Sequence, residues 1–433
     1  MLIKSLHISQ IKEIYQKTLM LLDQEIKVEG NRAGWYHFIG EKKIGNVATA
    51  QGILINSYLN NPNKLLNKIL LTLKESQYRG ENVFDLGGWS FVTSTQNAPT
   101  LEATVWVLLG LIAGGEPINS DIIIDGKEWI KRNQNLDGGW GSKKESCSRI
   151  YTTFLACRCF STLEPNLNRK NIEDVSNWVL SCQNVSDGGW GAGRGEASTP
   201  IHTAFALLTL HIIGSSIKEM QRGIQYLYTQ WKPQTMWEHT TKLEQYDVSK
   251  DGAGTRITFH YFPTPWIITA LLNIGESIYQ EQIFLGIKWL VQSQNKDGSW
   301  SVSEVPKNRF WSIHDAILAI TTFLDKAIST QTVDSMIKMG DIIILAKSHR
   351  DFARLAILSI IGLLMLGGVI GAILSSATTL GPLVQKYWAW IFLCIWIFST
   401  YPLAKLELLS KKEAILSIIL PVFLVIIQPH LSS

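Results

Sequence analysis

Six apolar segments recur along the first 325 residues of the chain, each following a polar turn. They are rich in Ala, Thr and Leu and apolar nearly all round, as buried helices are. The segments that precede the turns, such as 126–134, 175–183 and 286–294, instead carry apolar positions at helical spacing and end at Gly stop signals. The pattern predicts helical hairpins in which the buried second helices span residues 48–59, 101–113, 151–160, 201–213, 264–274 and 313–324.

The turns themselves repeat a short phrase that ends in tryptophan. Three copies are nearly complete: QNLDGGW ends at Trp140, CQNVSDGGW at Trp190 and SQNKDGSW at Trp300. Degenerate copies end at Trp35, Trp89 and Trp237, so that successive tryptophans lie 54, 51, 50, 47 and 63 residues apart. A period of this length indicates a repeat architecture.

Six such hairpins close most simply into a ring of two concentric layers, with the amphipathic helices outside. We therefore predict an all-α fold, an (α/α)6 barrel over residues 1–325. An open solenoid is the main alternative, but its concave face is expected to be polar rather than rich in Leu, Ala and Thr.

The turns at Gln134–Trp140, Gln183–Trp190 and Gln294–Trp300 resemble the QW repeats of squalene-hopene and oxidosqualene cyclases, which protein prenyltransferase β subunits share in looser form. The resemblance covers residues 30–325 and implies the barrel fold. It also implies that the repeats tie the outer helices together, so none of the six tryptophans is expected to be catalytic. Triterpene cyclases use two barrels, and the single barrel here implies a homo-oligomer or a partner protein for a large polycyclisation.

The last eighty residues have a different composition. No charged residue occurs between Leu355 and Gln385, a stretch long enough to cross a bilayer. We predict a transmembrane domain over residues 354–433, with three spans at 354–376, 387–404 and 414–430. Residues 326–353 are predicted to form an amphipathic juxtamembrane linker that contacts membrane lipid.

Flanking charges predict the orientation of these spans. Lys347, Arg350 and Arg354 precede the first span, whereas Lys386 alone lies between the first and the second. The positive-inside rule then predicts a multi-pass protein of the cell (inner) membrane with a cytoplasmic barrel and an outside C-terminus.

Charge and cysteine content exclude some classes of function. A net charge of +4 indicates no nucleic-acid partner, and the five cysteines include no CxxC pair, so neither a disulfide framework nor a zinc ribbon is predicted. The sequence indicates no cofactor.

Class II terpene cyclases, as the resemblance implies, start catalysis with a protonated Asp in a DxDD or DCTAE motif, and this chain has neither motif. The segment 100–104 aligns best with DxDD and gives Glu102 the central acid position. His314 and Asp315, at the same place in the sixth repeat, are further candidates. A polar residue at the barrel mouth with no part in catalysis is the alternative for each.

Protein prenyltransferases use zinc bound by an Asp-x-Cys pair and a distant His. The nearest counterparts here are Glu145, Cys147 and His202, a poor match that leads us to predict no metal site.

Basic residues follow several turns and precede the inner helices. The parallel inner helices would bring their positive N-terminal ends to one mouth, so arginines there suit a phosphorylated amphiphile. The alternative is that they pair with surface glutamates. The ligand-binding candidates are Arg149, Tyr151, His202, Arg256, His260, Tyr261, Arg309 and Trp311.

The fifth period contains an extra segment, residues 238–262, which we predict to be a ligand-binding loop or lid, or else a solvated insertion. Two functions remain open. One is a membrane-anchored terpene cyclase or prenyltransferase-like protein that binds an isoprenoid or another anionic amphiphile. The other is a catalytically silent sensing or scaffold barrel coupled to a membrane-spanning effector domain.

Overall fold

The structure is a computed structural model that describes residues 5–37, 39, 43–93, 98–144, 146–164, 169–247, 256–278, 280–303, 305, 309–329 and 343–345. The chain forms two compact units. One consists of Ser9–Ile278 and Gln282–Lys338, and the other of Met1–Ile8, Tyr279–Glu281 and Met339–Ser433.

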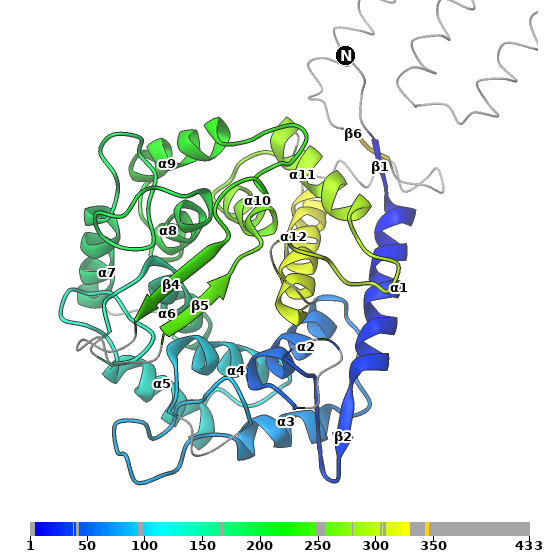
Figure 1. The fold of residues 1–433 in the computed structure, drawn as a ribbon, viewed down its shortest axis with the longest axis vertical. Coiled ribbons are helices and arrows are strands. Elements are labelled where there is room, and N and C mark those ends of the chain that lie inside the picture. The colour runs from blue at the N-terminus through cyan, green and yellow to red at the C-terminus, as the bar shows by residue number, and fades with distance from the viewer. Residues whose placement is uncertain are drawn as a thin grey trace, which may run out of the picture. The chain divides into compact units, whose positions relative to one another are not determined.

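Six inner helices form a closed ring in the first unit (Figure 1). Each packs against the next along the chain, and the last, α12, packs against the first, α2. This closure confirms a toroid and excludes an open solenoid. The inner helices begin within three residues of their predicted starts: α2 (Asn46–Tyr58), α4 (Leu101–Ala113), α6 (Ile150–Leu163), α8 (Pro200–Ile212), α10 (Pro263–Asn273) and α12 (Phe310–Ser329).

The outer helices surround this ring and bury one face only. In α9 (Ile217–Thr229), the buried residues Met220, Gly223, Ile224 and Leu227 recur at helical spacing, whereas α8 is buried from Pro200 to Leu210. A single apolar stripe is what a helix at the surface of a barrel requires. The other outer helices are α1 (Ile8–Glu25), α3 (Leu66–Glu75), α5 (Asp121–Arg132), α7 (Arg169–Ser181) and α11 (Glu281–Gln292).

All six repeat tryptophans make the same hydrogen bond. Each indole is at most 2% exposed, and its Nε1 donates to a backbone carbonyl near the C-terminal end of the preceding outer helix, at 2.7–2.9 Å. Helix ends leave carbonyls without intrahelical partners, and burying one unpaired costs free energy. The tryptophans therefore cap the outer helices while filling the space between the layers.

The repeat glutamines hold the turns, and Gln294 also reaches an outer helix. Gln134, Gln183 and Gln294 each donate to the carbonyl of the first glycine of their own turn, at 2.8–3.1 Å. Gln294 also donates to the Ile14 carbonyl and the Thr18 hydroxyl of α1, at 3.1 and 3.0 Å. The last turn is thereby joined to the first helix, as closure of the outer layer requires.

Strands form small additions to the helices. β2 (Lys27–Glu29) and β3 (Arg32–Gly34) form an antiparallel hairpin. β4 (Leu243–Asp247) pairs antiparallel with β5 (Arg256–His260), Leu243 opposite His260. The segment 238–262, predicted to be a loop, is thus partly a β-hairpin, because ten of its residues satisfy their backbone groups across a two-stranded ladder. In the second unit, β1 (Ser5–His7) pairs antiparallel with β6 (Ile343–Leu345).

None of the helices in the described ranges is long and apolar enough to cross a membrane. The three spans predicted between residues 354 and 430 lie outside those ranges, as does most of the predicted linker. Helix α12 continues to Ser329, past the predicted barrel boundary at 325. Residues 343–345 of the predicted linker form the short strand β6.

Two glycines provide a test of the turn. Gly138 has φ +94°, and an added Cβ would lie 2.4 Å from the Asp174 carbonyl oxygen of α7, whereas Gly115 has φ +93° with nothing within 4 Å. We expect Gly115→Ala to lower the free energy of unfolding by about 1 kcal/mol, from backbone strain alone. Gly138→Ala should lower the free energy of unfolding by about 3 kcal/mol or more, because the turn after α5 must also move away from α7. Chemical denaturation of both variants measures the difference; equal losses would contradict a role of Gly138 in joining the helices.

Candidate functional site

A cavity of about 210 Å³ opens among the N-terminal halves of the inner helices. It collects residues that are far apart in the sequence, because the ring brings equivalent positions of all repeats to one end. Seven of the eleven predicted site residues line it: Glu102, Tyr151, His260, Tyr261, Arg309, Trp311 and Asp315. Residues not predicted for the site, among them His37, Phe91, Trp106 and Phe259, complete the wall.

Asp315 places a buried carboxyl group in this wall. It lies in the second turn of α12 and is 5% exposed. Burial raises the pKa of Asp315 well above its usual value, although a hydrogen bond from Trp266 and the charge of Arg158 both favour the carboxylate. Burial therefore favours the protonated form of the Asp315 carboxyl group.

A chain of polar groups lies behind Asp315. His314 Nδ1 is 2.9 Å from Asp315 Oδ1, and His314 Nε2 is 3.5 Å from the Tyr58 hydroxyl. That hydroxyl accepts a hydrogen bond from Arg158 Nη2 at 3.1 Å. Burial lowers the pKa of His314 well below its usual value, and the charge of Arg158 lowers it further, so the imidazole is neutral. His314 does not line the cavity.

Arg158 was not predicted as a site residue. Its guanidinium lies over the rings of Trp106 and Trp266, with the carbon at 5.0 and 5.6 Å from the ring centroids. Both rings line the cavity. A single Arg between two cysteines on an apolar helix gives no local signal of this arrangement, which arises only when α4, α6 and α10 come together.

Glu102, the first acid candidate, is fully buried in the first turn of α4. Ser142 Oγ donates to its Oε2 at 2.7 Å. Two acidic side chains, Glu102 from the second inner helix and Asp315 from the sixth, thus line one cavity.

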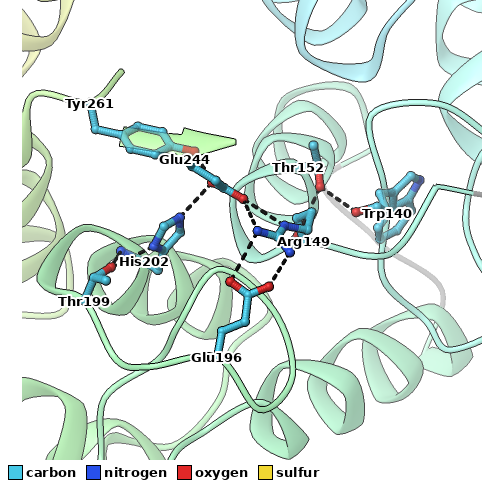
Figure 2. Close-up of polar contacts among 8 residues, drawn as sticks. All are labelled: Trp140, Arg149, Thr152, Glu196, Thr199, His202, Glu244 and Tyr261. Carbon is cyan, nitrogen blue, oxygen red and sulfur yellow. Dashed lines mark hydrogen bonds and ion pairs between the residues drawn. The ribbon is translucent and has the colours of Figure 1, made fainter. Parts of the chain in front are cut away.

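The Glu244 carboxylate at the end of the β4–β5 hairpin engages three of the predicted ligand-binding residues (Figure 2). Arg149 Nε and Nη2 lie 2.8 and 2.7 Å from Glu244 Oε1. His202 Nε2 lies 2.8 Å from Oε2, which also accepts a hydrogen bond from the Tyr261 hydroxyl. Arg149 pairs in addition with Glu196.

Arg149 thus pairs with glutamates of the chain, as the alternative interpretation has it, and ligand binding by Arg149 and His202 stays a prediction. Neither residue lines the cavity, because both are engaged by carboxylates of the chain itself. Burial alone would raise the pKa of Glu244, but hydrogen bonding and charge from His202, the charge of Arg149 and the Tyr261 hydroxyl lower it to about 2.

The other predicted ligand-binding residues include three that line the cavity and one whose side chain is not described. Arg309, His260 and Trp311 are half-buried and line the cavity. Arg256 is the first residue of β5, and its side chain lies outside the described part of the structure. His37 faces the same cavity; burial and the nearby Arg309 charge lower its pKa to about 4, so its imidazole is neutral.

Aromatic rings make the cavity wall continuous with the hairpin. Tyr151 lies with its ring centroid 5.3 Å from that of Tyr261 and 5.4 Å from that of Phe259. Phe154 and Phe205 stack behind them at 5.1 Å. These aromatic rings give part of the wall an apolar, electron-rich surface that suits a hydrocarbon ligand.

The structure offers no support for a zinc site in the described residues. No group of three His, Cys, Asp or Glu side chains there is arranged to hold a metal ion. Cys147 is exposed, His202 is bound to Glu244, and Glu145 lies outside the described residues.

Two protein families match parts of the sequence. Residues 146–246 match the squalene-hopene cyclase C-terminal domain, and residues 89–190 match the prenyltransferase alpha-alpha toroid domain. Drimenyl diphosphate synthase of Streptantibioticus cattleyicolor is 24% identical over 196 residues, which is 43% of this chain and 34% of that protein. Squalene–hopene cyclase of Zymomonas mobilis is 22% identical over 246 residues, 49% of this chain and 36% of that protein. The chain spans about a third of the length of these relatives.

Solved structures share the fold at low sequence identity. The type II terpene cyclase MstE from Scytonema, in complex with its substrate geranylgeranyl dihydroxybenzoate, has a TM-score of 0.52 at 15% identity, covering 74% of this chain and 98% of that one. A GH76 α-mannanase from Bacteroides thetaiotaomicron has a TM-score of 0.50 at 11% identity, with 75% and 97% covered. The chain thus has the toroid fold of terpene cyclases and sequence similarity to cyclases and prenyltransferases, while the fold also serves unrelated chemistry.

The buried Glu244 cluster predicts a pH dependence of stability. Because the folded-state pKa is lowered from 4.5 to about 2, Glu244 stabilises the fold above pH 4.5, and this contribution is lost as the pH falls towards 2. The shift corresponds to about 3 kcal/mol. We expect Glu244→Gln to be less stable than the wild type at neutral pH, with the gap narrowing below pH 4.5.

Urea denaturation at a series of pH values measures this gap. Glu128→Gln is the matched control, since its carboxylate is 45% exposed and pairs only with Lys131 in the described structure; its gap should stay below about 0.5 kcal/mol throughout. A Glu244→Gln gap that is independent of pH would contradict the ionised cluster.

Proposed function

We propose that the barrel cavity binds an isoprenoid chain and that Asp315 protonates one of its double bonds, which starts a cyclisation or isomerisation. The observation that carries the proposal is a buried carboxyl group in the wall of a cavity that is lined by aromatic rings; burial favours its protonated form. A general acid must hold its proton until the substrate is in position, and desolvation provides that condition.

The proposed reaction begins with proton transfer from Asp315 to a double bond. The O–H bond of Asp315 breaks and the proton forms a C–H bond at one alkene carbon, leaving a carbocation at the other and a carboxylate at Asp315. Attack by a second double bond of the same chain closes a ring. Loss of a proton from the final cation to the carboxylate restores the acid.

The surrounding groups suit both charged species of this step. The faces of Trp106 and Trp266, with Tyr151 nearby, attract a cation by their ring electrons. The hydrogen bond from Trp266 and the charge of Arg158 favour the Asp315 carboxylate that remains after proton transfer. Interactions that strengthen as charge develops are the ones that accelerate a reaction.

The proposal also assigns the C-terminal region to a membrane. The uncharged stretch between Leu355 and Gln385 and its flanking basic residues support an inner-membrane anchor with a cytoplasmic barrel. An anchored barrel would draw a hydrophobic substrate from the bilayer. The whole chain is expected to stay in the membrane fraction after an alkaline carbonate wash; its release into the supernatant would contradict the anchor.

A second candidate function is a sensing barrel that binds an amphiphile without converting it. It is favoured by one observation, that carboxylates of the chain occupy the basic residues of the mouth. Such a barrel would pass a binding signal to the C-terminal region rather than release a product.

Isotope incorporation separates the candidates. Purified protein is incubated in D2O with geranylgeranyl diphosphate or with geranylgeraniol, and the extracts are analysed by mass spectrometry. An acid-initiated reaction predicts a product that carries deuterium from solvent. Asp315→Asn should lower the rate by at least about 100-fold, because an amide has no acidic proton to give.

Glu102→Gln serves as the comparison, since Glu102 is a buried acid of the same cavity. If Glu102→Gln abolishes deuterium incorporation and Asp315→Asn retains it, Glu102 is the acid instead. If neither substrate is converted but one of them protects the wild type against thermal unfolding, the sensing function is supported.

A further inference from the structure

Most of the side chains that bind the Glu244 carboxylate come from the helices of the barrel, not from the hairpin that carries Glu244. Arg149 is the N-cap residue of α6, and His202 lies in the first turn of α8. The Thr199 hydroxyl lies 2.7 Å from His202 Nδ1 and orients the ring so that Nε2 points at Glu244 (Figure 2). Only the Tyr261 donor comes from beside β5.

The side chains around Glu244 are arranged as in an oxyanion-binding site. One carboxylate accepts from a guanidinium, an imidazole and a phenol at a place where the N-terminal ends of two helices meet. Charge-assisted hydrogen bonds to Arg and positive helix ends are the features that bind phosphate groups. Arg149 and His202 side chains are only 11% and 4% exposed, so the site is desolvated as well as charged.

The site adjoins the cavity through Tyr261. The Tyr261 hydroxyl binds Glu244 while its ring lines the cavity, together with Thr258, Phe259 and His260 of the same hairpin. An amphiphile with its tail in the cavity would therefore carry its polar end towards Arg149 and His202.

We propose that Glu244 is an internal substitute for the oxyanion head group of the ligand, and that a phosphate ester displaces it from Arg149 and His202 when the ligand binds. The β4–β5 hairpin then serves as a latch, held closed by the contacts of Glu244 with Arg149 and His202. The proposal rests on the proposed function only for the nature of the hydrophobic tail; the head-group site stands on the Glu244 contacts alone.

Displacement of Glu244 has a measurable consequence. When a site is occupied by a group of the same protein, the apparent affinity for an external ligand is reduced by the fraction of molecules in which the site is free. Glu244→Gln removes the competing charge, so farnesyl diphosphate should bind at least about tenfold more tightly than to the wild type by isothermal titration calorimetry. Glu244→Gln should also bind inorganic pyrophosphate more tightly than the wild type does, whereas its affinity for farnesol should change little.

Two further variants of the full chain test the assignment. Arg149→Ala in the Glu244→Gln background should abolish the gain, because the guanidinium is the principal partner of the anion. Gln245→Ala is the matched control: it is the next residue of β4, exposed, and bonded only to Thr258 in the described structure. It should bind farnesyl diphosphate as the wild type does.

Every outcome bears on the proposal. The proposal is overturned if Glu244→Gln binds farnesyl diphosphate no more tightly than the wild type does, or if the gain in affinity survives Arg149→Ala. An equal gain in affinity for farnesol would also overturn it, because the hairpin would then cover the cavity without providing a head-group site. If Glu244→Gln does not fold by circular dichroism, Glu244→Asp, which keeps the charge but withdraws the carboxylate by one methylene, should show an intermediate gain, and no gain would overturn the proposal. Tighter diphosphate binding without any isoprenoid conversion would reject the proposed reaction and leave the head-group site standing.

Discussion

The structure depends on one interaction repeated around the ring, the hydrogen bond from a buried indole to the last turn of an outer helix. An outer helix packed on one face only has few contacts that fix its position along the barrel. The tryptophan supplies that position, because its N–H must meet a carbonyl that would otherwise be buried without a partner. The glutamine of each complete turn adds a second constraint within its own turn, and Gln294 extends it to the next helix.

This regularity explains why the site is where it is. Each repeat delivers the start of its inner helix to the same end of the ring, so the chemistry of the cavity is set by whichever residues occupy those starts. Glu102, Tyr151 and Asp315 come from three different repeats, yet they line one space of about 210 Å³. The tryptophans and glutamines of the repeats are not among the residues that line the cavity, and the positions between them supply its wall.

The helices could be predicted from the sequence because a similar turn motif separates the outer from the inner helix in all six repeats. The β4–β5 hairpin was not predicted, although Asp251-Gly252 lies between its strands, because each strand is only five residues long. Glu244 was missed because its partners lie 95 and 42 residues away. Asp315 was found as a candidate, but its raised pKa follows from burial by residues that are distant in the sequence, which the local sequence does not show.

Closure of the ring also has a consequence for the synthesis of the chain. The bonds that complete the outer layer join Gln294 to residues 280 and 276 positions earlier, and the inner layer closes only when α12 meets α2. During translation the first five hairpins must therefore wait, with the apolar flank of α2 uncovered, until residues beyond 310 have left the ribosome. Contacts of such long sequence separation slow folding and prolong the exposure of apolar surface. A nascent chain of this kind is expected to be a substrate for chaperones until its last inner helix arrives.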